Sequence, residues 1–233
     1  MTYENLIIDR RDDGVALLVL NRPDAMNSFN KAMVKEFEHL WPSLANNGDV
    51  NCIVLRAAPG RAFSAGIDVK EDASLLAAES EPDQVWNFID PGPFLGPKSM
   101  KCWKPLITAV HGITAGGAFY WVNESDIVIA ADDAEFFDPH VCYGMVSAIE
   151  PIGMTYRMPL QDVLRMVLLG NSERMCAQTA LRAGIVSEVM PFEQLWDRAH
   201  DLARIIAAKP PAATAGSVRA IWESLDLPRS VAL

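Results

Sequence analysis

Hydrophobic and polar positions alternate along the first half of the chain in short blocks that predict strands followed by helices. Residues 6–10 and 15–20 are apolar-rich blocks separated by a polar stretch that ends in Asp13-Gly14, which predicts a β-hairpin. Asn30 precedes apolar residues at helical spacing, so we expect its side chain to cap a helix. Further buried strands are predicted at residues 52–56, 105–110, 127–131 and 135–138.

Helical spacing dominates the second half of the chain. Helices are predicted at residues 69–78, 150–169, 177–183, 192–208 and 213–225, with a partly helical stretch at 84–89 and a strand at 186–190. Gly153 and Pro159 are expected to interrupt one of these helices, Ser172 to cap the next and Gly184 to end it. The whole pattern predicts an α/β fold, with a core domain over residues 1–190 and a helical region over residues 191–233.

Two adjacent glycines stand where the strand at 105–110 gives way to a helical pattern. Gly116 and Gly117 let the backbone turn sharply and leave its N–H groups at the positive end of a helix dipole. Such a turn favours an anion or a developing oxyanion, although the same glycines also suit close packing of a helix on a strand. A second turn of small residues, 64–66, precedes another predicted helix. Two convergent N–H groups would form an oxyanion hole, worth roughly a few kcal/mol per donor.

Charge and cysteine content narrow the class of protein. A net charge of −10 and a pI near 4.8 argue against non-specific binding to nucleic acid or anionic membranes, which requires a basic face. The four cysteines are far apart without CxxC spacing, so we expect reduced, mostly buried thiols and no metal site. The first residues lack a signal-peptide pattern, and no apolar run reaches membrane-spanning length. These features predict a soluble, cytoplasmic protein.

Several spaced motifs, in order along the chain, carry a resemblance to a known family. They are Asn21-Arg22-Pro23, Ala62-Phe63-Ser64-Ala65-Gly66-Ile67-Asp68, Ala109-Val110-His111-Gly112 with Gly116-Gly117, Phe136-Phe137-Asp138-Pro139 and Lys209-Pro210-Pro211. On these motifs the chain resembles the crotonase, or enoyl-CoA hydratase/isomerase, superfamily over nearly its whole length. The resemblance implies a spiral of ββα units with a helical C-terminal trimerisation region, assembled as a homotrimer or as a dimer of trimers, a hexamer.

The resemblance also implies an acyl-CoA substrate and assigns residues to it. The backbone N–H groups of Ala65 and Gly117 match the oxyanion hole that holds a thioester carbonyl as it becomes an enolate. The residues that match the region for coenzyme A are Asp24, Ala25, Met26, Ala65, Gly66, Ile67 and Asp68. Coenzyme A is then part of the substrate, and no separate cofactor is implied. Capping of a helix explains Asp68 equally well.

The catalytic side chains depart from the family pattern. Enoyl-CoA hydratases of the family carry two glutamates, and this chain has Tyr120 and His140 at the matching positions, which makes it an atypical member lacking both. His140 is a candidate general base because an imidazole titrates near neutrality, or it is a structural histidine bonded to Asp138. Tyr120 either donates a hydrogen bond or fills the space of a glutamate. Glu150 is a spare carboxylate and the alternative candidate for the base, although a structural role for a glutamate at a helix N-terminus explains it more simply.

By resemblance, the default activity is that of an enoyl-CoA hydratase-like lyase of fatty acid metabolism that works through an oxyanion-stabilised enolate. A one-base isomerase, a hydrolase or another lyase suits Tyr120 and His140 at least as well. A catalytically silent acyl-CoA-binding protein is the alternative outside the enzymes. The loss of both glutamates supports a silent binding protein. The retention of both turns that match the oxyanion hole argues against it, because binding alone needs no stabilised oxyanion. Family members usually continue for one or two helices beyond the segment that matches residues 221–233.

Overall fold

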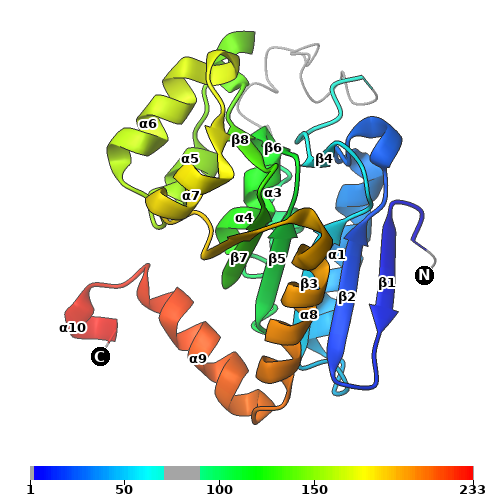
Figure 1. The fold of residues 1–233 in the computed structure, drawn as a ribbon. Coiled ribbons are helices and arrows are strands. Elements are labelled where there is room, and N and C mark those ends of the chain that lie inside the picture. Colours follow the sequence, from blue (N-terminus) through cyan, green and yellow to red (C-terminus); the bar gives the residue numbers. More distant parts are fainter. Residues whose placement is uncertain (1–2, 71–89, 233) are drawn as a thin grey trace, which may run out of the picture.

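Six strands form the main sheet of the computed structural model, which describes residues 3–70 and 90–232 (Figure 1). The strands run in the order β1 (Leu6–Arg10), β2 (Val15–Leu20), β3 (Cys52–Ala57), β5 (Leu106–Val110), β7 (Ile127–Ala131) and β10 (Glu188–Met190). β1 and β2 form the predicted antiparallel hairpin, with Leu6 opposite Leu20. The other neighbouring strands pair in parallel. The strands expected in this part of the chain are confirmed, with small differences at their ends.

Helices cover both faces of this sheet, which explains why its parallel strands are nearly continuous apolar runs. α1 (Lys31–Ala45) packs buried aromatic and leucine side chains against one face. α8 (Phe192–Ala207) packs a stripe of mostly alanines against the other face (Figure 1). Asn30 caps α1 as predicted, because its side chain accepts a hydrogen bond from the Met33 N–H at 2.9 Å. The core therefore has two layers of helix around one sheet.

A second, four-stranded sheet carries the turns of the predicted oxyanion hole. Its order is β4 (Ala62–Ser64), β6 (Ile113–Ala115), β8 (Glu135–Phe137) and β9 (Met175–Cys176). The chain crosses into this sheet at Gly112, whose φ is +54° and whose added Cβ would collide with the Arg61 carbonyl. Gly116 and Gly117 stand at a junction of a strand with a helical segment, as predicted, but the strand that precedes them is β6 and not the one predicted at 105–110.

The remaining helical elements are short, apart from α6 and α9. They are η1 (Pro23–Ala25), α3 (Gly92–Leu95), η3 (Gly116–Ala118), α4 (Phe119–Glu124), η4 (His140–Tyr143), α5 (Ile149–Met154), α6 (Leu160–Leu169), η5 (Gly170–Ser172), α7 (Ala177–Ala183), α9 (Pro211–Ser224) and α10 (Arg229–Ala232). The predicted interruption is confirmed at Pro159, which precedes α6, but not at Gly153, which lies inside α5. Ser172 does not cap α7, because it ends η5 and Cys176 takes the capping position. Gly184 ends α7 with a φ of +93°, as predicted.

Two sequence-based expectations fall wholly or mostly outside the described residues. The predicted helix at 69–78 is described only at Val69 and Lys70, which form a turn, and the stretch at 84–89 is not described.

At the other end of the chain, α9 and α10 extend away from both sheets (Figure 1). α9 is held by Trp222, whose indole Nε1 donates to Asp126 Oδ1 at 2.7 Å. In residues 3–70 and 90–232, we find no helix with the length and apolar character needed to cross a membrane.

Candidate active site

The Gly116-Gly117 turn lies directly beside the turn that follows β4. A Cβ placed on Gly66 would lie 2.8 Å from the Ala115 carbonyl oxygen and 2.9 Å from the Gly117 nitrogen, so only glycine permits this approach. Gly66 also has a φ of +84°, which favours glycine. Gly117 is the second residue of η3, where an N–H group has no acceptor within its own turn. The structure thus brings together the two turns paired from the sequence.

The other predicted donor, the Ala65 N–H group, already has an acceptor. It donates to the carbonyl oxygen of Met26 at 3.0 Å. Met26 and the following Asn27 have φ angles of 52° and 50°, a conformation that non-glycine residues adopt rarely. A ligand oxygen would therefore reach the Ala65 N–H group only by replacing the Met26 carbonyl or by sharing the donor with it.

The residues predicted to contact coenzyme A form one contiguous region around Ala65. Asp24 and Ala25 belong to η1, next to Met26, and Asp24 is exposed. Ile67 pairs with Phe29 in an isolated β-bridge. Asp68 is only 8% exposed, and its carboxylate accepts hydrogen bonds from Arg22 Nη1 at 2.9 Å and from the Lys70 N–H at 3.1 Å. The Asp68 carboxylate therefore ties this region together.

His140 begins η4, and its imidazole lies against the glycine turn. A Cβ placed on Gly116 would be 3.5 Å from His140 Cε1. The imidazole Nδ1 is 2.6 Å from Asp138 Oδ1, and the same oxygen accepts the His140 backbone N–H at 3.0 Å. The other oxygen of Asp138 accepts a hydrogen bond from Ser147 Oγ at 2.7 Å. His140 thus makes the contact expected of a structural histidine and also borders the turn that carries Gly117.

Glu150, the second residue of α5, faces the other nitrogen of the imidazole. Its Oε1 is 3.6 Å from His140 Nε2, and its side chain is 6% exposed. Tyr120 on α4 donates its hydroxyl to Asp90 Oδ2 at 3.1 Å and also interacts with the Glu150 carboxylate. These side chains form one group, called the acid–histidine cluster below: Asp90, Tyr120, Asp138, His140 and Glu150.

The cluster shifts the protonation of its own members. The hydrogen bond to Asp138 raises the pKa of His140, and burial lowers it by less. The charges of Asp138, Glu150 and Asp90 also raise this pKa. Burial alone would raise the pKa of Asp138, but its bonds with His140 and Ser147 prevail and lower it. Burial raises the pKa of Glu150, and burial together with the neighbouring carboxylates raises that of Tyr120. Near neutral pH, Asp138 is therefore ionised and Tyr120 is neutral.

The glycine turn predicted to hold an oxyanion, an imidazole and a buried carboxylate lie in one place, and such groups can transfer a proton next to a carbonyl group. Residues 10–230 match the sequence model of the family described as enoyl-CoA hydratase/isomerase. The chain belongs to this family. The crotonase resemblance inferred from the motifs is thereby confirmed.

Curated relatives in the enoyl-CoA hydratase/isomerase family differ in the reaction that their names give. The (E)-benzylidenesuccinyl-CoA hydratase of Thauera aromatica is 29% identical over 92% of this chain and 81% of its own length. The short-chain-enoyl-CoA hydratase of Clostridium acetobutylicum is 28% identical over 100% of this chain and 87% of its own length. The 1,2-epoxyphenylacetyl-CoA isomerase of Escherichia coli is 32% identical over 88% of this chain and 77% of its own length. Family membership therefore does not decide between a hydratase and an isomerase.

Solved structures confirm the crotonase-type α/β fold. An enoyl-CoA hydratase/isomerase from Mycobacterium paratuberculosis superposes with a TM-score of 0.87 at 35% identity, covering 99% of this chain and 87% of that one. An enoyl-CoA hydratase from Mycobacterium smegmatis gives a TM-score of 0.88 at 27% identity, covering 98% and 86%.

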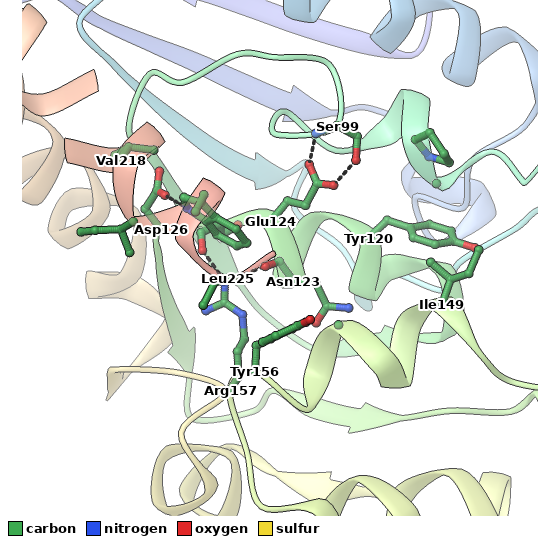
Figure 2. A pocket seen from close by; sticks show the side chains of 16 residues that line it. Ser99, Tyr120, Asn123, Glu124, Asp126, Ile149, Tyr156, Arg157, Val218 and Leu225 are labelled. Atoms are coloured by element: carbon green, nitrogen blue, oxygen red, sulfur yellow. Dashed lines mark hydrogen bonds between the residues drawn. The ribbon is translucent and has the colours of Figure 1, made fainter. Parts of the chain in front are cut away.

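A cavity of about 520 Å³ adjoins the acid–histidine cluster at Tyr120 (Figure 2). It lies between α4, α5 and α9, and its apolar wall includes Ile149, Ile221 and Trp222. Tyr120 lines this cavity, whereas Gly117 and His140 do not. Glu124 also borders it, but its carboxylate points to Ser99 and is held by backbone and side-chain donors there (Figure 2). Glu124 is therefore not part of the cluster.

Asp90 is the member of the cluster that the sequence analysis missed. It precedes Pro91 and Gly92, and its Oδ1 accepts the Gly92 N–H at 2.7 Å, an arrangement typical of an Asx-turn. The sequence signal at this position therefore indicates a turn. The contact with Tyr120, thirty residues further along the chain, depends on the tertiary fold.

Proposed function

We propose that this protein transfers protons on an acyl-CoA thioester, with His140 Nε2 as the general base and Glu150 as its acidic partner. The observation that carries the proposal is the 3.6 Å approach of His140 Nε2 to Glu150 Oε1, beside the glycine turn. The Gly117 N–H group would donate a hydrogen bond to the thioester carbonyl oxygen as negative charge develops on that oxygen. The Ala65 N–H group would give up its hydrogen bond to the Met26 carbonyl and donate to the same thioester oxygen.

Hydration is the reaction that uses both groups of this pair. His140 Nε2 would take a proton from water as the water oxygen bonds to the β-carbon of an enoyl thioester. The electrons of the double bond would move onto the thioester oxygen, and the α-carbon would then take a proton from neutral Glu150. Burial favours the neutral form of Glu150, because it raises the pKa of this carboxyl group. Names of relatives such as the short-chain-enoyl-CoA hydratase support this assignment.

Isomerisation is the second candidate, and Tyr120 favours it. A phenol stands where the hydratase pattern has its first glutamate, and its raised pKa means that it remains a hydrogen-bond donor rather than a base. A single base, His140, would then remove a proton from one carbon of the acyl chain and return it to another. The name of the 1,2-epoxyphenylacetyl-CoA isomerase of Escherichia coli, at 32% identity, supports an isomerase as the second candidate.

Two further expectations from the resemblance remain proposals. The region that includes Asp24, Met26, Gly66 and Asp68 would bind coenzyme A, since it surrounds the Ala65 donor. A homotrimer or a dimer of trimers would cover the apolar side chains that are exposed on the outer helices, such as Ile152, Leu160, Leu168 and Ile221. Light scattering of the purified protein would measure this assembly.

A panel of acyl-CoA and enoyl-CoA thioesters in D₂O, followed by mass spectrometry, tests the proposal. Hydration adds one D₂O to the product, isomerisation adds none and moves the double bond, with deuterium only on carbons whose protons exchange with solvent, and hydrolysis releases coenzyme A. His140→Ala should abolish turnover, and Glu150→Gln should strongly reduce it. His39→Ala is the matched control, because His39 is exposed and bonds only to Tyr3 among the described residues. Binding without turnover of any thioester would instead support a catalytically silent acyl-CoA-binding protein.

A further inference from the structure

Asp138 holds the imidazole of His140 from the side opposite to Glu150. Its carboxylate is fully buried, and each of its oxygens has a donor within 3.0 Å. One oxygen accepts from Nδ1 and from the backbone N–H of His140, and the other accepts from the Ser147 hydroxyl. The carboxylate is therefore fixed in position by two elements of the chain, the segment after β8 and the loop before α5.

This arrangement decides which imidazole nitrogen carries the proton when His140 is neutral. An ionised carboxylate accepts hydrogen bonds and cannot donate them, so the nitrogen 2.6 Å away must be the protonated one. Nδ1 is therefore the N–H donor, and Nε2 is left as the basic nitrogen. Nε2 is also the nitrogen that faces Glu150. Without the carboxylate, nothing in the described contacts of Nδ1 would select this tautomer.

We infer that Asp138, held in place by Ser147, is a positioning residue that makes His140 Nε2 the working base of this enzyme. The inference rests on the proposed function, since a base is needed only if the protein transfers protons. As Nε2 takes a proton, the positive charge that forms on the ring lies next to the ionised Asp138. This favours the protonated imidazole and raises the basicity of Nε2.

Other charged or titratable groups near His140 act on the same equilibrium and need to be separated from Asp138. Glu150 reaches it from α5, Asp90 acts from the segment before α3, and Tyr120 lies on α4 in contact with both of these acids. Asp90 raises the pKa of His140 through its charge, and Glu150 does so when it is ionised, but neither is hydrogen-bonded to Nδ1. The tautomer of the neutral ring therefore reports on Asp138, whereas the pKa of His140 reports on all the acids.

The test uses the full-length protein and two measurements. The chain has four histidines, so ¹⁵N NMR of histidine-labelled protein can assign the His140 signals by their loss in His140→Ala. The wild type should show the proton on Nδ1 and a pKa above the ordinary histidine value. Asp138→Asn should lower this pKa and remove the preference for Nδ1–H. With the thioester that the wild type converts, kcat should fall by about 10²- to 10⁴-fold with little change in KM. The base-dependent limb of the pH profile should move to lower pH.

A second variant and a control keep the test decisive if Asp138→Asn folds poorly. Ser147→Ala removes one hydrogen bond from the Asp138 carboxylate at a half-buried position, so it should keep the Nδ1–H tautomer with a smaller loss of kcat. Glu36→Gln is the matched control, because it neutralises another buried, hydrogen-bonded carboxylate far from His140 and should change neither readout.

Wild-type protein with the proton on Nε2, or Asp138→Asn with unchanged tautomer, pKa and kcat, would overturn the inference. Absence of turnover in the wild type would refute the proposed function instead, while the tautomer measured in the same sample would still show whether Asp138 orients the ring.

Discussion

Replacing Gly66 with alanine should disable the site through the backbone alone. The φ of +84° at this residue costs an alanine about 1–2 kcal/mol. The new Cβ would also lie 2.8 Å from the Ala115 oxygen and 2.9 Å from the Gly117 nitrogen. Both are main-chain atoms that cannot rotate away, so overpacking adds about 1–3 kcal/mol. We therefore expect the free energy of unfolding to fall by about 2–5 kcal/mol and Tm by about 5–15 °C.

The same substitution should separate the two turns and misplace the Gly117 N–H group. Loss of one oxyanion donor lowers kcat by about 10²- to 10³-fold, so turnover of the best thioester in the panel should fall by this factor in protein that is still folded. Thermal unfolding and steady-state kinetics on the same preparation provide the two measurements.

Gly14→Ala is the control that isolates the conformational term. Gly14 has a φ of +81°, and its added Cβ would meet the flexible side-chain amide of Asn51 at 3.1 Å in the hairpin turn. We expect its free energy of unfolding to fall by about 1–2 kcal/mol and its kcat to stay unchanged. If Gly66→Ala were no less stable than Gly14→Ala and kept its kcat, the close approach of the two turns would not matter for the site.

Three further changes test other parts of the structure. Tyr120→Phe removes the hydroxyl group that interacts with Asp90 and Glu150. We expect kcat to fall by roughly 5- to 100-fold and the pKa of Glu150 to rise further. An unchanged pH profile would mean that the Tyr120 side chain only fills space. His111 is buried, and burial lowers its pKa, so the unfolded chain takes up a proton near about pH 6.5 that the folded chain does not. The contribution of neutral His111 to the free energy of unfolding is therefore present above that pH and is lost as the pH falls toward the lowered pKa. In denaturant titrations, the free energy of unfolding of His111→Leu should fall less between about pH 7 and pH 5 than that of the wild type. Asn30→Ala should cost about 1 kcal/mol by removing the cap on α1, and equal denaturation midpoints would contradict this.

Local patterns in the sequence were sufficient for most elements of the fold. The Asp-Gly turn between β1 and β2, the Asn30 cap and the glycine after α7 each act within a few residues, so their chemistry is visible in the sequence itself. β6 was missed because a three-residue strand between Gly112 and Gly116 is too short to show a period. Its place depends on pairing with β4 and β8, which lie far away in the chain.

The candidate site could be predicted in part for the same reason. Ala65, Gly117, Tyr120 and His140 were found from their positions in motifs, and the structure brings their segments together. The Met26 carbonyl on the Ala65 N–H group and the Asp90 carboxylate on Tyr120 could not be predicted. Both contacts join segments about thirty to forty residues apart, and no local pattern encodes which acceptor a given donor will meet.

One part of the site is fixed by the backbone, and the other part is formed by side chains from separate elements. At Gly66 and Gly117 an added Cβ would lie within 3.0 Å of neighbouring atoms, so the fold itself fixes the oxyanion turns. Tyr120, His140 and Glu150 meet only through the ends of their side chains, which come from three separate helical elements. The resemblance to hydratases thus predicts where charge is stabilised more securely than it predicts which side chain moves the proton.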